Sequence, residues 1–137
     1  MDSLNKAADI ALSGMKAQSE RLRVISENLA NADSLPTAPD QMPYRRKVMT
    51  FRSVLDSDIG ADVVKVAKVD VDRSQLPKKY DPHHPAADAQ GYVLTPNVNP
   101  LVEMMDMREA ERSYEANLDV VTTTKSMLAN TINLLRT

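Results

Sequence analysis

Apolar residues recur with a four-three spacing at both ends of this 137-residue chain, and the middle of the chain lacks that pattern. At the first end the spacing is carried by Leu4, Ala8, Ala11, Met15, Gln18, Leu22, Ile25 and Leu29. At the other end it is carried by Tyr114, Leu118, Val121, Lys125, Leu128, Ile132 and Leu135. Such a spacing places one stripe along a helix, and the stripe is normally buried against another helix. The sequence therefore predicts two long terminal helices that each need a helical partner.

All eight prolines lie between Pro36 and Pro100. Proline lacks an N–H group and restricts the residue before it, so this stretch cannot form long regular helix. We therefore expect an N-terminal helix over 1–31, a loop and small β insert over 32–99, and a C-terminal helix over 100–137. The predicted fold class is α+β, in which the terminal helices form an antiparallel, coiled-coil-like pair and the insert is β-rich or irregular.

Local signals place the boundary of the second helix and the strands. Asn99 suits the position that caps a helix, and the proline after it suits the first helical position. Between Asp62 and Asp72 the apolar period changes to two, which predicts a strand with an irregularity near residues 67–68. Short strands are expected at 75–80 and 92–95.

Composition excludes several classes of protein. The net charge is −2, whereas a nucleic-acid binder shows a basic excess. There is no cysteine, so neither disulfides nor thiolate metal sites are available. No run approaches the roughly 20 apolar residues that span a bilayer. The first residues do not read as a cleaved signal, so we expect a protein that is soluble or leaves the cell without one.

No catalytic, cofactor-binding or metal-binding residue is expected. His83 and His84 are the only histidines, and adjacent residues rarely point at one metal. The three glycines, Gly14, Gly60 and Gly91, form no phosphate-binding loop. Acidic residues early in the second helix are explained by its dipole.

A basic cluster, Arg45, Arg46 and Lys47, has no acid beside it in the sequence. Contact with an acidic patch on a partner subunit is one interpretation, and a solvated loop is another. Gln18 and Lys125 interrupt the apolar stripes, which predicts either a mark that fixes register or a stripe that drifts around a helix of 3.6 residues per turn.

The segment Asn28-Leu29-Ala30-Asn31, at the end of a long amphipathic helix, resembles the motif that ends the first helix of flagellar rod and hook axial proteins. Further segments resemble the proximal-rod members of that family, in the same order and over most of the chain. They are 43–47, 80–85, 91–93, 96–99, 103–107, 113–117 and 125–127. The chain departs from the family in its paired His83-His84, where Gly-His is more usual.

The resemblance implies a structural subunit of the bacterial flagellar basal-body rod, needed for motility, that transmits torque to the hook. Such a subunit would be exported unfolded by the flagellar type III apparatus, without a cleaved signal peptide, and would polymerise through its terminal helices in the periplasmic space. Its partners would be itself, other proximal and distal rod proteins and the rod-to-export-gate adaptor. Neither nucleic-acid binding nor membrane insertion is implied.

Two other classes of protein share parts of this sequence pattern. A helical chaperone or adaptor of a type III secretion system would also have amphipathic ends, but the proline-rich middle argues against a compact chaperone. An enzyme would have to use the histidine pair and the acidic helix, which lack the geometry of a site.

Deletion of residues 2–30 separates these classes. A rod subunit without its first stripe should lose both assembly and motility, because the stripe of the second helix then has no partner. An enzyme housed in the insert would keep its turnover, and that result would contradict the structural role.

Overall fold

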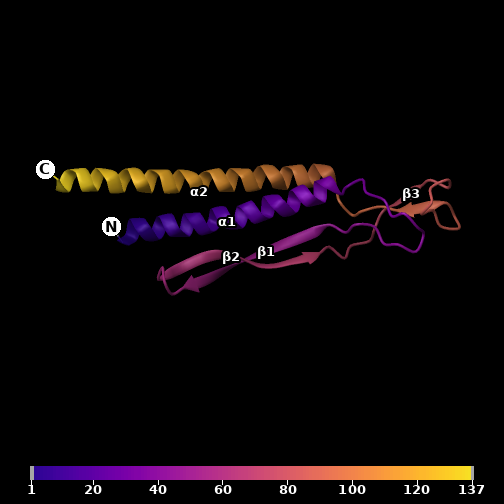
Figure 1. Ribbon diagram of the computed structural model, residues 1–137, viewed down its shortest axis with the longest axis horizontal. Helices are drawn as coiled ribbons and strands as arrows, with labels where there is room; N and C mark the ends of the chain where they lie inside the picture. Colours follow the sequence, from indigo (N-terminus) through magenta and orange to yellow (C-terminus); the bar gives the residue numbers. More distant parts are fainter. Residues whose placement is uncertain (1, 137) are drawn as a thin grey trace. The chain divides into compact units, whose positions relative to one another are not determined.

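The computed structural model describes residues 2–136 and contains two helices and four strands (Figure 1). Helix α1 spans Asp2–Ala30 and helix α2 spans Pro100–Leu135. Between them lie two two-stranded sheets. The first pairs β1, Lys47–Asp56, with β2, Ala61–Val71, and the second pairs β3, Lys78–Tyr80, with β4, Tyr92–Leu94. The predicted α+β class is confirmed.

The chain forms two compact units, and each long element contributes to both. The first unit comprises Met1–Leu22, Thr50–Lys68 and Arg108–Thr137. The second unit comprises Arg23–Met49 and Val69–Met107. None of the described helices is long and apolar enough to cross a membrane.

Polar side chains satisfy the helix ends at the insert. Asn99 Oδ1 accepts a hydrogen bond from the Leu101 N–H at 3.1 Å, so the predicted cap of α2 is confirmed. At the end of α1, Asn31 Nδ2 donates to the Glu27 carbonyl at 2.9 Å, and the Asn31 N–H donates to the same oxygen. These bonds occupy groups that a helix end otherwise leaves without an intrahelical partner.

Within the first unit, α1 packs against both α2 and the β1–β2 hairpin. Arg21 forms an ion pair with Glu109 at 3.5 Å, and Gly14 lies against Asn117, so the two helices run antiparallel (Figure 1). On the hairpin side, Ser13 Oγ accepts a hydrogen bond from the Val64 N–H at 3.2 Å. The predicted antiparallel pairing therefore holds in this unit, with a strand pair added to it.

Strand β2 and the residue after it bond to two segments. The Val64 N–H donates to Ser13 Oγ of α1, and the Asp72 N–H donates to the Arg46 carbonyl just before β1. The predicted irregularity near residues 67–68 stays a prediction.

The second unit contains the short sheet and a small core. Strands β3 and β4 pair antiparallel, with Lys79 opposite Val93 and Tyr80 opposite Tyr92, which confirms both predicted short strands. Val93 is fully buried. Gly91 has a φ of 88°, and a Cβ there would lie 3.0 Å from the Tyr80 ring, so this turn requires glycine.

Candidate assembly surfaces

Gly14 of α1 accommodates a side chain of α2. A Cβ added to Gly14 would lie only 2.7 Å from Asn117 Nδ2, so the Asn117 side chain would have to move. Ala11, Gly14 and Ala17 are buried on α1, and Ala17 lines a groove on the side of the hairpin.

The predicted stripe of α1 is only partly the buried face. Ala11 and Ile25 are buried, but the other stripe positions are half-buried, namely Leu4, Ala8, Met15, Gln18, Leu22 and Leu29. Ala17 is buried although it lies off the stripe. The reason in the first unit is that α1 contacts α2 and the hairpin on different sides, which widens its buried arc. Among the described residues, the buried Gln18 Oε1 has no hydrogen-bond partner.

On α2 the inward-facing row differs from the predicted stripe at alternate positions. In the first unit, the buried or half-buried residues of α2 with a four-three spacing are Ala110, Tyr114, Asn117, Val121, Thr124, Leu128 and Thr131, and Ser113 is half-buried beside this row. Tyr114, Val121 and Leu128 belong to both rows. Asn117 and Thr124 face inward in place of Leu118 and Lys125, which are exposed. At Asn117 the facing residue is Gly14, which leaves room for the amide.

Several large apolar side chains of α2 also stay exposed. Their exposed fractions run from 43% to 76% for Leu118, Val120, Met127, Ile132, Leu134 and Leu135. Exposed apolar residues gathered on one element mark interaction surfaces more often than isolated ones do.

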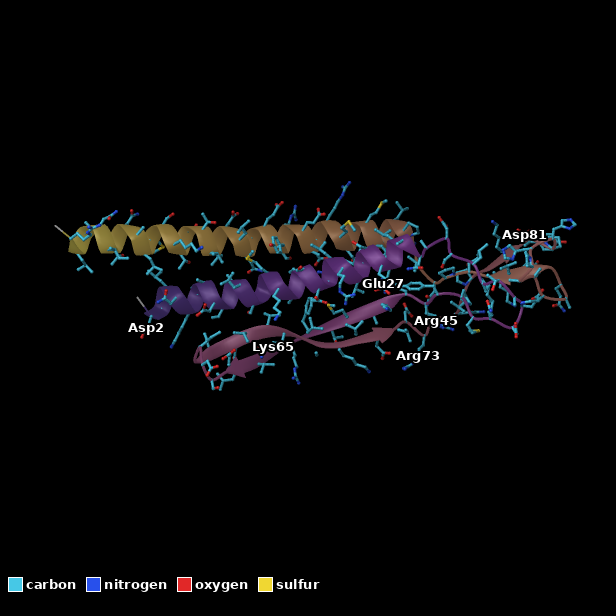
Figure 2. The ribbon with its side chains drawn as sticks, viewed as in Figure 1. Asp2, Glu27, Arg45, Lys65, Arg73 and Asp81 are labelled. Atoms are coloured by element: carbon cyan, nitrogen blue, oxygen red, sulfur yellow. The ribbon has the colours of Figure 1, made fainter. Side chains whose placement is uncertain are left out.

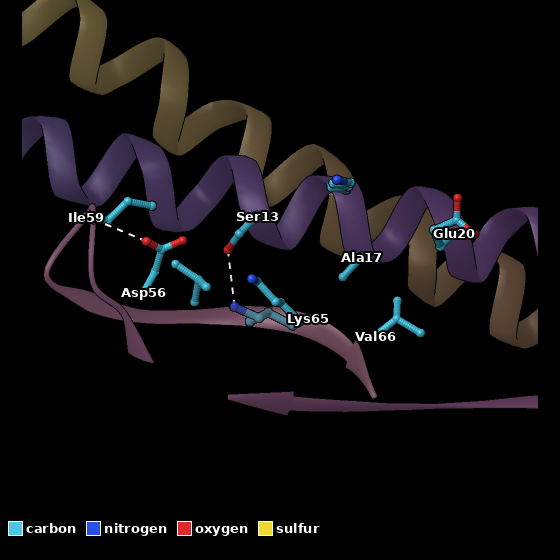
Figure 3. A pocket seen from close by; sticks show the side chains of 10 residues that line it. Ser13, Ala17, Glu20, Asp56, Ile59, Lys65 and Val66 are labelled. Atoms are coloured by element: carbon cyan, nitrogen blue, oxygen red, sulfur yellow. Dashed lines mark hydrogen bonds between the residues drawn. The ribbon is translucent and has the colours of Figure 1, made fainter. Parts of the chain in front are cut away.

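A groove lies between α1 and the hairpin within the first unit (Figure 3). Its volume is about 650 Å³, and Ala17, Ile59 and valines of β2 contribute apolar lining. Lys16, Glu20, Asp56 and Lys65 add charges of both signs, and the described lining includes neither histidine nor cysteine. Ser13 also lines the groove, and its hydroxyl donates a hydrogen bond to the Ile10 carbonyl at 2.6 Å.

In the second unit, Asn28 joins the end of α1 to the start of β1. Its Oδ1 accepts hydrogen bonds from the Tyr44 hydroxyl at 2.6 Å and the Lys47 N–H at 2.9 Å. Its Nδ2 donates to the Lys47 carbonyl at 2.9 Å and to Glu103 Oε2 at 3.3 Å. An asparagine side chain has two acceptor positions and two donor hydrogens, so this buried amide is fully used.

Glu103, on the first turn of α2, is fully buried and is paired with Arg46. Arg46 also lies 3.4 Å from an Asp106 oxygen and 3.6 Å from an Asp72 oxygen. Burial acts to lower the pKa of Arg46, but the hydrogen bond to Glu103 and the three carboxylate charges raise it overall. The guanidinium is therefore charged, and it compensates the buried carboxylate.

Acids of the chain itself pair with Arg46 and Lys47. Lys47 Nζ lies 2.6 Å from Glu27 Oε1. Arg45 donates to the backbone carbonyls of Asp72 and Ser74 (Figure 2 labels Glu27 and Arg45). These acids and carbonyls lie far away in sequence and are brought in by the fold, and contact of the basic cluster with a partner subunit stays a prediction.

Tyr44 and Asp72, in the same unit, also have shifted pKa values. Burial, with the charges of Glu27 and Glu103, raises the pKa of Tyr44 from 10.0 to about 12. Hydrogen bonds from the Ser74 backbone and side chain, with the charge of Arg46, hold the pKa of Asp72 below its usual value.

The histidine pair lies in a turn. His84 Nδ1 accepts a hydrogen bond from the Ala86 N–H at 3.0 Å, and the His84 N–H donates to the Asp81 carbonyl at 3.1 Å. No group of three or more potential metal-ligating side chains occurs within residues 2–136.

Sequence reasoning missed the junction of Asn28, Tyr44, Arg46 and Glu103. One signal was present, because Glu103 lies seven residues before Ala110 and so continues the inward row of α2. An acid on such a row requires a cation from elsewhere in the chain. The arginine could not be chosen from the spacing.

Two protein families match the chain at its ends. Residues 9–34 match the family described as "Flagella basal body rod protein", and residues 89–134 match "Flagellar basal body rod FlgEFG protein C-terminal". Three relatives named flagellar basal-body rod protein FlgC are similar over nearly their whole length. The protein of Agrobacterium fabrum is 54% identical over 99% of this chain and 98% of its own. That of Salmonella typhimurium is 47% identical over 92% and 93%, and that of Bacillus subtilis is 38% identical over 92% and 94%.

Replacement of Asn28 by alanine should destabilise the second unit. It leaves buried partners of the amide unsatisfied, at about 1–3 kcal/mol each, so a loss of about 3 kcal/mol is expected in chemical denaturation. Asn31→Ala, in the same motif but half-buried, is the matched control and should lose about 1 kcal/mol. Equal losses in the two variants would contradict the central role of Asn28.

Tyr44 should make the protein sensitive to alkaline pH. Because its folded pKa is raised, its contribution is complete below about pH 10 and is lost as the pH rises toward about 12. The free energy of unfolding of the native chain should therefore fall more steeply over this range than that of Tyr44→Phe. Tyr80→Phe, at an exposed ring, should follow the native chain. A Tyr44→Phe curve parallel to the native one would disprove the linkage.

Proposed function

The chain belongs to the FlgC family of flagellar basal-body rod proteins, and on that basis we propose that its two terminal helices carry its assembly into the rod. It is a structural subunit of the basal-body rod that associates with other rod components. The finer proposal concerns which segments assemble: the N-terminal helix over 1–31 and the C-terminal helix over 100–137, with the insert over 32–99 between them.

The observation that carries this proposal is the exposed apolar surface of α2. In the first unit the inward row of α2 is occupied by α1 of the same chain, yet six large apolar side chains on this part of the helix stay exposed. A helix that is apolar on more than one side is typical of a helix buried by several neighbours. Packing of these side chains against adjacent subunits would remove them from water, and it would build a wall of helices.

The ranges that match the two families support assembly through the terminal helices rather than through the insert. The family matches cover 9–34 and 89–134, which contain most of both helices, and neither range includes residues 35–88. Helices shared among rod proteins are suited to a common packing scheme. The insert is then the part that distinguishes this subunit from its neighbours.

We further propose the partners and the route. The partners are other copies of this chain, the proximal and distal rod proteins, and the rod-to-export-gate adaptor, and the subunit reaches them through the flagellar type III apparatus without a cleaved signal. The absence of cysteine is compatible with passage as an unfolded chain. In the assembled rod the subunit transmits torque mechanically and performs no catalysis.

A charged residue on the outer surface of α2 should block assembly without unfolding the subunit. We expect Met127→Glu combined with Leu134→Glu to leave thermal unfolding of the free subunit nearly unchanged, because both side chains are already exposed. In cells that lack the native gene, this variant should restore neither motility nor the subunit's presence in purified basal bodies.

Ser126→Glu combined with Asn130→Glu, at exposed polar positions of the same helix, is the matched control and should assemble normally. If the native chain were found with the export apparatus and not in purified basal bodies, the assembly role would be wrong and a chaperone role favoured.

A further inference from the structure

Two exposed tyrosines lie opposite each other on the short sheet of the second unit. Tyr80 on β3 is the register partner of Tyr92 on β4. Val93, the neighbour of Tyr92, is fully buried, and side chains alternate between the two faces of a strand, so the tyrosines point to the outer face. Their exposed fractions are 65% for Tyr80 and 42% for Tyr92.

The hydrogen bonds of this sheet place the two tyrosines as close as a pair of strands allows. The Asp81 N–H donates to the carbonyl of Gly91, directly opposite, at 2.9 Å. Hydrogen-bonded and non-hydrogen-bonded pairs alternate along an antiparallel ladder, so Tyr80 and Tyr92 form a non-hydrogen-bonded pair, the kind with the closer side chains. Their ring centroids lie 5.3 Å apart, and the ring planes meet at 64°.

The surroundings keep both rings beside each other. A Cβ built at Gly91 would lie 3.0 Å from Tyr80 Cε2 and 3.1 Å from Pro82 Cβ, so the edge of the Tyr80 ring rests against the turn. The Tyr92 N–H donates to Asp88 Oδ1 at 2.9 Å, and the Asp88 N–H donates to the Tyr92 carbonyl at 2.9 Å. The backbone of Tyr92 is therefore held on the side away from β3 as well.

Two phenols in such contact can be joined by one-electron oxidation. An oxidant of the peroxidase class removes one electron and one proton from each hydroxyl group, which gives two phenoxyl radicals. Each radical shares its unpaired electron with the ring carbons next to the hydroxyl-bearing carbon, and two of these carbons couple to form a C–C bond. Each coupled carbon then releases its hydrogen as a proton, and each oxygen takes one up. One hydrogen peroxide accepts the two electrons and two protons and leaves as two waters.

The other two tyrosines are not arranged for this coupling. Tyr80 and Tyr92 are the one pair of aromatic rings in contact within residues 2–136. The Tyr44 hydroxyl is occupied by its hydrogen bond to Asn28, and Tyr114 is half-buried on α2 in the first unit. Because coupling requires two radicals in contact, the sheet selects its own tyrosine pair.

We propose that Tyr80 and Tyr92 form an oxidative cross-linking site, at which a one-electron oxidant of the peroxidase class joins the two rings into a dityrosine. The product ties β3 to β4 and closes the turn between them covalently. Such a link limits the open states of the segment that it encloses, as a disulfide does, in a chain that has no cysteine. The inference goes beyond the assembly role and does not depend on it.

The test treats the dilute, purified full-length chain with a peroxidase and an equimolar amount of hydrogen peroxide. The main product should elute as a monomer, show dityrosine fluorescence and have the mass of the native chain minus two hydrogen atoms. Mass spectrometry after proteolysis should find the link between positions 80 and 92. Links formed mainly between two copies, or mainly at other tyrosines, would overturn the inference.

Matched variants check that the geometry of the sheet directs the link. Lys79→Tyr combined with Tyr80→Phe keeps the number of tyrosines but moves one phenol to the other face of β3, at a position that is already exposed. Its yield of the internal link should fall about tenfold or more, as should that of Tyr80→Phe, because the two phenols no longer meet. Tyr114→Phe should give the native yield. An undiminished yield in the double variant would overturn the inference, provided that circular dichroism shows the native fold.

The Val93 N–H reports whether the link clamps the sheet. Val93 is fully buried on β4, and its hydrogen exchange requires local opening of the strand pair. In the cross-linked chain this exchange should slow about tenfold or more, because the open state has lost conformational freedom. An unchanged exchange rate would show that the link forms without tying the strands, and the clamp would be wrong.

Discussion

The side-chain amide of Asn28 is the contact on which the second unit depends. It bonds both the N–H and the carbonyl of Lys47, so the end of α1 holds the start of β1 as a neighbouring strand would. It also bonds Tyr44 and Glu103, which come from the loop and from α2. One residue therefore ties three segments of the chain at a buried point. This explains why asparagine, a poor helix former, stands in the last turns of α1.

The charges around Asn28 follow from the same constraint. Glu103 is buried, and an unpaired buried carboxylate would be strongly destabilising. Arg46 supplies the compensating charge and is itself surrounded by three carboxylates, while Lys47 pairs with Glu27. A basic cluster that looks like a binding site in the sequence is thus used to close the base of the insert. The side of α2 opposite Glu103 carries exposed apolar side chains.

In both units, polar or small residues occupy the inward side of α2. In the first unit, Gly14 accommodates Asn117, and Asn117 and Thr124 occupy places where leucine or lysine was expected. In the second unit, a buried acid occupies the inward side of α2. In both units several large apolar side chains of α2 stay exposed. For a subunit of a rod this distribution is physically sensible, because surface that is not used within the chain is available between chains.

The sequence by itself determined the features that depend on nearby residues. The four-three spacing predicted both helices, the prolines bounded the insert, Asn99 predicted the start of α2, and the change to a period of two predicted β2. Only the tertiary structure decided which side of α2 faces inward and which acids pair with Arg46. A stripe read at 3.5 residues per turn is uncertain by one position on a helix of 3.6, and the structure shows that Asn117, not Leu118, contacts Gly14. The pairing of Arg46 with Glu103 joins residues 57 positions apart, a separation that only folding removes.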